Sequence, residues 1–240
     1  MFVILCSLCA ILAISKQSHA IPSLEPDDLT NRASENTVLE RLVRVERIIQ
    51  RLVKDTSKGH ASTYVRWGKT TCPGNDTELV YKGFAAGSHY LHSGGAADLL
   101  CLPDVPTWGK HVGGTGSTGF IYGAEYELFS GSNPFPTVSL NDDASCCVCR
   151  PPRTTTIMVP GRTDCYPGWN QEYTGYLLSG YYGHAGNSNY VCVDANPDPV
   201  FGGFASYDGH LMYVVQAQCG SLPCPPYVQG RVIACVVCSK

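Results

Sequence analysis

The sequence predicts a mainly β protein, built from tandem duplicated, disulfide-rich β half-units that follow a short N-terminal coiled-coil helix. Three observations lead to this prediction. The same order of cysteines occurs twice along the chain. The 25 Gly and 16 Pro residues, together with frequent Tyr, favour short strands joined by turns. Helical periodicity is confined to one segment before residue 60.

The duplication is indicated by the spacing of the cysteines. Matching cysteines of the two copies are separated by 93, 91, 89 and 89 residues. Tyr81–Phe84 and Tyr173–Tyr176 keep the same phase, and so do Pro73-Gly74 and Pro167-Gly168. We interpret residues 64–150 as a first cysteine-rich repeat and residues 151–240 as a second. The matched cysteines are Cys72, Cys101, Cys146 and Cys149 in the first copy and Cys165, Cys192, Cys235 and Cys238 in the second.

The first 20 residues are predicted to be a cleaved signal peptide. Their apolar core spans about 14 residues, fewer than the ~20 that cross a bilayer, and the segment ends in Ser18-His19-Ala20, with small residues at the last and third-last positions. No Lys or Arg precedes the apolar run, and an uncleaved anchor is the alternative. Residues 21–36 are predicted to be a polar leader. We expect a secreted, extracellular protein without a membrane partner.

Secretion determines the expected chemistry of the cysteines. The chain has 13 Cys, and removal of Cys6 and Cys9 with the signal leaves 11. In an oxidising compartment their default state is disulfide-bonded. Zinc is disfavoured, because the CxxC pairs are far apart and no His lies at ligand spacing from them. Aligning CCVC with CVVC sets Cys147 against Val236, so we expect Cys147 to be free or to form an interchain bridge.

Residues 37–54 predict a coiled-coil helix, and residues 55–63 predict a flexible linker. Apolar residues alternate at spacings of 4 and 3, and Arg41 and Glu46 fall at positions that can pair between neighbouring helices. This pattern favours a homotrimer. The alternative is an amphipathic helix packed on its own globular domain. The residues expected to carry oligomerisation are Val38, Arg41, Leu42, Val45, Glu46, Ile49 and Leu52.

The globular part resembles the non-collagenous domain that ends type IV collagen chains. The resemblance rests on a Pro-Gly turn after the first Cys, a Tyr-x-Gly-aromatic strand and a closing Cys-x-x-Cys in each half. The sequence is more similar still to the C-terminal domains of sponge short-chain collagens and related invertebrate secreted proteins. It covers residues 64–240, but the chain has no Gly-X-Y repeat and cannot form a collagen triple helix. The segments that carry this closer similarity are Tyr64–Pro73, Gly94–Pro103, Ile121–Glu127 and Pro223–Tyr227.

The resemblance implies all-β halves in which the first Cys pairs with the last and the second with the next-to-last. It also implies one local bridge in the second half, where the first half has Phe129 instead of a cysteine. Sequence spacing alone leaves other pairings open. The implied pairs are Cys72–Cys149, Cys101–Cys146, Cys165–Cys238, Cys192–Cys235 and Cys219–Cys224.

Several polar residues are candidates for binding sites. Asn75 opens an Asn-Asp-Thr sequon and is expected to be glycosylated. His89 and His92, with Asp98, could hold an ion or a sugar, and His184 occupies a similar place in the second copy, but solvated or core histidines are commoner. The acidic residues Asp142, Asp143, Asp194 and Asp198 could touch calcium, yet exposed turn carboxylates are the better interpretation. We therefore expect no metal site.

Aromatic residues suggest a second type of surface. Tyr176, Tyr181, Tyr182 and Tyr190 could stack against sugars, although strand aromatics in a β core explain them equally well.

The sequence has no recognisable catalytic motif, so we expect neither an enzyme nor a bound cofactor. A net charge of −3 and 15% charged residues give no basic surface for nucleic acid. The leading interpretation is a secreted structural or extracellular-matrix protein that trimerises through the coiled coil. Its expected partners are further copies of itself and matrix components or glycans. The alternative is a trimeric, lectin-like recognition protein, in which three heads would multiply a weak sugar affinity.

Overall fold

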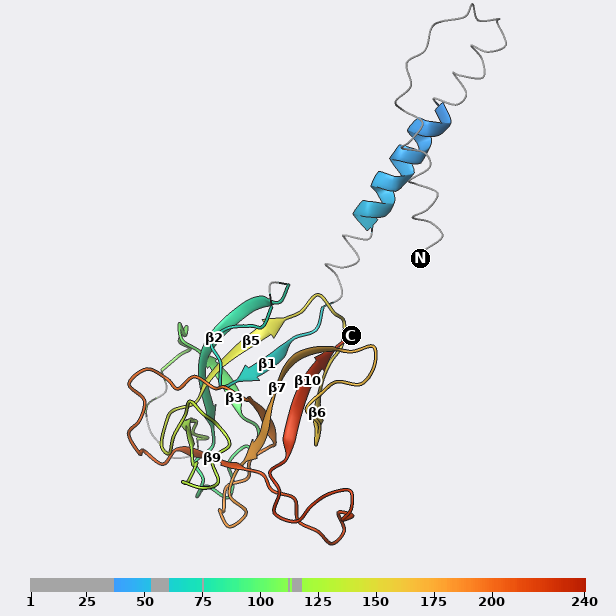
Figure 1. Ribbon diagram of the computed structural model, residues 1–240. Helices are drawn as coiled ribbons and strands as arrows, with labels where there is room; N and C mark the ends of the chain where they lie inside the picture. Colours follow the sequence, from blue (N-terminus) through green and yellow to red (C-terminus); the bar gives the residue numbers. More distant parts are fainter. Residues whose placement is uncertain (1–36, 53–60, 75, 112, 114–117) are drawn as a thin grey trace, which may run out of the picture. The chain divides into compact units, whose positions relative to one another are not determined.

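The computed structural model describes residues 37–52, 61–74, 76–111, 113 and 118–240 (Figure 1). The expected signal peptide, polar leader and glycosylation site at Asn75, and most of the expected linker, lie outside these residues. The chain divides into two compact units, Met1–Lys54 and Asp55–Lys240. We describe each unit by itself.

In the first unit, residues 37–52 are helical, as the 4-and-3 spacing of apolar residues predicts. Every apolar side chain of this segment is exposed in the single chain, with exposed fractions from 40% for Val43 to 58% for Leu42 and Leu52. Among the described residues, no helix is both long and apolar enough to cross a lipid bilayer.

The second unit is built from ten strands, so the prediction of a mainly β protein is confirmed. Apart from the longer β2 and β7 the strands are short, and Gly or Pro residues occur in the connections between them. In chain order they are β1 (Tyr64–Trp67), β2 (Glu78–Gly87), β3 (Leu100–Pro103), β4 (Tyr122–Tyr126), β5 (Ser145–Arg150), β6 (Thr156–Pro160), β7 (Asn170–Ser179), β8 (Val191–Asp194), β9 (His210–Val214) and β10 (Ala234–Ser239).

The first five strands and the last five share one pattern of antiparallel pairing. In the first set, β5 lies between β1 and β2, and β2 also pairs with β3 and β4. In the second set, β10 lies between β6 and β7, and β7 also pairs with β8 and β9. Each set therefore places its closing Cys-x-x-Cys strand in the middle (Figure 1).

Two glycines occupy matching places in these sets. Gly83 of β2 is opposite Cys146, and Gly175 of β7 is opposite Cys235. A Cβ atom added to Gly83 would lie 1.7 Å from the carbonyl oxygen of Leu102, and one added to Gly175 would lie 1.7 Å from that of Val193. Both strands thus need a residue without a side chain where the neighbouring backbone approaches closely.

Two parallel contacts join the sets. Trp67 of β1 is opposite Val193 of β8, and β4 pairs with β9 along three residues beginning with Ala124 opposite His210. Because β9 also pairs with β7, the succession of paired strands leads from β7 through β8, β1, β5, β2, β4 and β9 back to β7. The two expected repeats therefore form one compact unit instead of two.

The hydrophobic core is shared between the sets. One buried cluster combines Trp67 and Tyr126 of the first set with Leu178, Val193 and Met212 of the second. A second cluster combines aromatic, aliphatic and sulfur side chains, namely Tyr64, Cys147, Cys149, Tyr173, Leu177, Cys192, Cys235 and Val237. Each set consequently buries apolar surface against the other.

Candidate functional site

Five disulfides stabilise the β unit, and they are the same five pairs that the family resemblance implied. Each long bridge joins a Cys in a loop, in β3 or in β8 to the closing strand of its own set, β5 or β10. The Cα–Cα distances lie between 5.7 and 6.0 Å, within the ordinary range. Among the described residues, no bridge connects a residue before 150 with one after 165. The pairs are Cys72–Cys149, Cys101–Cys146, Cys165–Cys238, Cys192–Cys235 and Cys219–Cys224.

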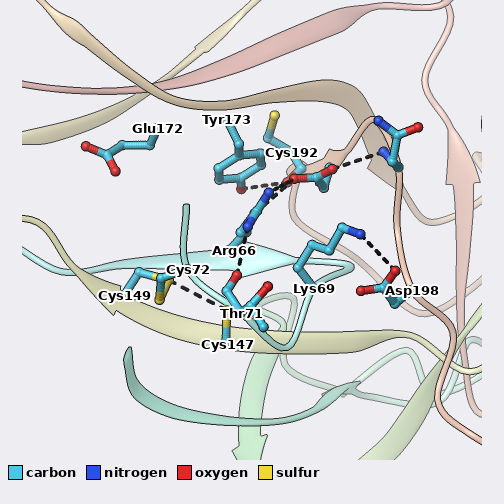
Figure 2. A network of polar contacts seen from close by, with 12 residues as sticks. Arg66, Lys69, Thr71, Cys72, Cys147, Cys149, Glu172, Tyr173, Cys192 and Asp198 are labelled. Carbon is cyan, nitrogen blue, oxygen red and sulfur yellow. Dashed lines mark hydrogen bonds and ion pairs between the residues drawn. A yellow bond between two sulfur atoms is a disulfide. The ribbon is translucent and has the colours of Figure 1, made fainter. Parts of the chain in front are cut away.

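Cys147 is free and completely buried in the second core cluster. Its Sγ lies 3.6 Å from Sγ of Cys149, beside the Cys72–Cys149 bridge (Figure 2). Burial raises the pKa of the Cys147 thiol to about 11, although the nearby Arg66 guanidinium opposes this shift. In the single chain, Cys147 is therefore an unpaired and inaccessible thiol. A direct interchain bridge would require this strand to open.

A buried ion pair links the two sets of strands next to this sulfur cluster. Nε and Nη2 of Arg66 in β1 donate to Oδ2 of Asp194 in β8, at 2.9 and 2.6 Å. Only 14% of the Arg66 side chain and 7% of the Asp194 side chain are exposed. Arg66 also donates to the carbonyl of Thr71 and stands over the ring of Tyr173 (Figure 2).

Further polar contacts continue this seam between the sets. The Tyr173 hydroxyl lies 3.2 Å from the carbonyl of Val65 in the first set and 2.8 Å from the carbonyl of Cys192 in its own set. The Tyr64 hydroxyl donates to buried Glu172 at 2.9 Å. Nη2 of Arg153 donates to the other oxygen of Glu172 at 2.8 Å. Sequence patterns did not identify these partners, because Tyr64 and Glu172 are 108 residues apart.

The acidic residues singled out in the sequence have structural partners. Asp194, expected as an exposed turn carboxylate, is instead buried against Arg66, because β8 lies beside β1. Asp198 pairs with Lys69 at 2.8 Å. Asp142 accepts the backbone N–H of Ser139 at 2.7 Å. Burial raises the pKa of the half-buried Asp143 carboxyl. These residues do not converge on one point as calcium ligands would.

Histidines and tyrosines of both sets form one continuous run of ring contacts. The ring of His89 stacks on His92, with centroids 4.8 Å apart. Tyr90 contacts His184 of the second set at 4.6 Å, and Tyr181 contacts the same His184 at 5.2 Å. The sequence placed His184 at a position in the second copy similar to that of His89 and His92 in the first, and the structure brings the three rings into one cluster.

This cluster lacks the arrangement of a metal site. Among the described residues, the groups of three ligating side chains that come within 4.8 Å of one another are Cys72, Cys147 and Cys149, and Glu125, Glu127 and Asp208. The expected histidines and Asp98 belong to neither group, and Asp98 instead accepts a hydrogen bond from Asn189.

The four tyrosines that are candidates for a sugar-binding surface differ in their exposure to solvent. Tyr182 is 93% exposed, and its ring centroid lies 4.4 Å from that of Tyr181. Tyr190 is also exposed. Tyr176, by contrast, packs against the first core cluster and meets Phe135 edge-on, with ring centroids 5.4 Å apart. Tyr176 is therefore a core residue and not part of that surface.

A scan against models of known protein families finds none that matches this chain. The similarity to the end domain of type IV collagen therefore depends on the motifs quoted above.

Proposed function

We propose that this chain is a secreted structural protein of the extracellular matrix that assembles through its N-terminal helix. The five disulfides support an oxidising, extracellular environment. The proposed role is non-catalytic and requires no cofactor. Its partners are further copies of the chain and matrix components.

The proposal includes a head that arose by duplication and is similar to the collagen end domain. Three features support this origin: the common pairing pattern of the two five-strand sets, the matching glycines Gly83 and Gly175, and the confinement of each disulfide to one half. Unrelated halves would have no physical reason to need a glycine at the same register position. The extra bridge Cys219–Cys224 and the extra thiol Cys147 are differences acquired by single halves.

The observation that carries the proposed assembly is the exposed apolar face of the helix. Leu42 and Ile49 are 58% and 54% exposed in the single chain. Burying a leucine or isoleucine side chain stabilises an assembly by roughly 1.5–3 kcal/mol. The 4-and-3 spacing fits a coiled-coil seam, and Arg41 and Glu46 flank it at positions that pair between chains. A helix this short is marginal alone, so contacts between heads would add to it.

The test is the mass of the secreted protein, measured by light scattering during size exclusion. We expect three times the mass of one mature chain. The double variant Leu42→Asp/Ile49→Asp places two charges in the seam and should be monomeric. Arg47→Asp, at an outer position of the same helix, is the matched control and should remain trimeric. A monomeric wild-type protein would refute the assembly.

One observation favours a second function, recognition of glycans by a trimer. Tyr181 and Tyr182 form an exposed aromatic pair beside the half-buried ring of His184, and such exposed rings stack on the apolar faces of sugars. Binding to a glycan array that is lost both in Tyr182→Ala and in the monomeric double variant would support this function. Extraction from a matrix that requires a reductant would support the structural one.

A further inference from the structure

Three acidic side chains meet where β4 pairs with β9. Glu125 lies in β4, Glu127 follows its last residue, and Asp208 lies two residues before β9. Residues two apart in an extended strand point to the same side, so Glu125 and Glu127 share a face. One carboxylate oxygen from each of the three residues lies within 4.8 Å of the other two.

The Glu125 carboxyl group is an independent sign that this cluster binds a ligand. Its side chain belongs to a residue that is only 3% exposed, and its buried Oε2 has no hydrogen-bond partner in the described part of the chain. The other oxygen, Oε1, accepts the backbone N–H of Tyr207 at 3.2 Å. A buried, unsatisfied carboxylate oxygen is costly unless a proton or a cation satisfies it.

The charge of the cluster is not balanced by basic side chains. None of the seven ion pairs that join described residues includes Glu125, Glu127 or Asp208. Burial raises the pKa of the Glu127 carboxyl, and repulsion from Asp208 and Glu125 adds to the shift. Burial also raises the pKa of Glu125, while the backbone N–H groups of residues 207–209 oppose the increase. Burial is the first cause of both shifts and disfavours the charged form of each carboxyl group.

The donor set selects among cations. Carboxylate oxygens suit hard ions, whereas zinc prefers nitrogen and sulfur ligands. Two oxygens bound to one Ca²⁺ at about 2.4 Å can be at most about 4.8 Å apart, so the observed spacing is compatible with a single ion. Mg²⁺ requires shorter bonds and a near-ideal octahedron, and it usually keeps several of its waters. Asp208 is exposed, which leaves a route for the ion and room for water ligands.

We propose that Glu125, Glu127 and Asp208 bind one Ca²⁺ ion, which ties β4 of the first set of strands to the start of β9 in the second. The remaining ligands are water and backbone carbonyl groups. Calcium sites of extracellular modules have dissociation constants on the order of 10⁻⁴–10⁻³ M, and we expect this site to belong to that class.

The experiment uses the full secreted chain, stripped of metal with a chelator and then titrated with CaCl₂. Calorimetry should show one ion bound per chain. The melting temperature should rise by about 3–6 °C at ten times the dissociation constant. Asp208→Asn is the main variant, because the residue is exposed and its φ of 54° suits asparagine. It should weaken calcium binding at least tenfold, and Glu127→Gln should abolish it.

Glu78→Gln is the matched control, since Glu78 of β2 is an exposed carboxylate that pairs with Arg150 of β5. This variant should bind calcium like the wild type. Absence of both the heat and the temperature shift in the wild type would overturn the proposal. So would unchanged affinity in Asp208→Asn. An equal response to MgCl₂ would overturn the assignment to calcium. A higher stability of Glu125→Gln without any calcium response would show that a proton, and not a cation, satisfies the buried oxygen.

Discussion

The ion pair between Arg66 and Asp194 provides the sharpest test of how the two sets of strands are held together. Both side chains are largely buried, and two donor nitrogens of Arg66 contact one oxygen of Asp194. Arg66→Met removes the charge but keeps an apolar stem of similar length. Among the described residues, Asp194 then keeps the backbone N–H of Asn196, at 3.0 Å, as a hydrogen-bond donor.

Removing one partner of a buried pair costs about 3–5 kcal/mol, because the other charge stays buried without compensation. The free energy of unfolding, measured by urea titration of the oxidised protein, should fall by this amount. The melting temperature should fall by about 2–4 °C for each kcal/mol. Such a loss is a large part of the 5–15 kcal/mol typical of a domain.

Two further variants isolate the cause. The double variant Arg66→Met/Asp194→Asn removes both charges and keeps an acceptor for Asn196, so it should regain most of the loss. Lys69→Met breaks the neighbouring pair with Asp198, whose side chain is 52% exposed, and should cost at most about 1 kcal/mol. A loss below about 1 kcal/mol in Arg66→Met, or a double variant as unstable as the single one, would refute the reasoning.

Three other outcomes follow from the β unit. Gly175→Ala should prevent stable folding or cost several kcal/mol, because its Cβ would clash with the carbonyl of Val193. Gly123→Ala should be tolerated, since its Cβ meets no atom within 4 Å. Secreted yield and urea titration test both variants. The pKa of the Cys147 thiol is raised from its ordinary 9.0 to about 11 in the folded protein, so the free energy of unfolding should fall as pH rises through this range. Urea titrations at pH 8 and 10.5 should show a smaller fall for Cys147→Val than for the wild type. Replacing Cys192–Cys235 with alanines should cost about 4 kcal/mol and replacing Cys219–Cys224 about 2 kcal/mol, from loops of 43 and 5 residues, with equal losses contradicting the loop-entropy argument.

The sequence predicted the framework of the β unit better than its polar contacts. The phase of Tyr81–Phe84 and Tyr173–Tyr176 places these segments in β2 and β7, the long strands of the two sets. The cysteine order, together with the family resemblance, implied the five bridges that the structure contains. Both signals depend on residue types with narrow structural roles, namely Gly and Cys. The positions of such residues can be interpreted without knowledge of the tertiary fold.

Sequence patterns did not predict the contacts between the two sets of strands. Arg66 and Asp194 are 128 residues apart, and β1 meets β8 at a single paired position. Glu125 also escaped notice, because alternation along a strand normally directs charged side chains to solvent. In β4, however, Ala124, Glu125 and Tyr126 are all buried, since this strand lies between β2 and β9 and is covered on both faces. In such a strand, the alternation of apolar and polar residues does not predict which side chains are buried.

In the β unit, covalent bonds and non-covalent contacts stabilise different parts of the fold. The disulfides act within each set, whereas the contacts between sets are strand pairing, the shared core and the ion pair at Arg66. A fragment of residues 64–150 would keep its two bridges, yet it would expose the strand edges that β8 and β9 cover and the core side of Trp67. The sets can therefore separate without breaking a sulfur bond. For this reason substitutions at the seam, and the proposed calcium ion beside β9, should affect the cohesion of the head more than its oxidation state does.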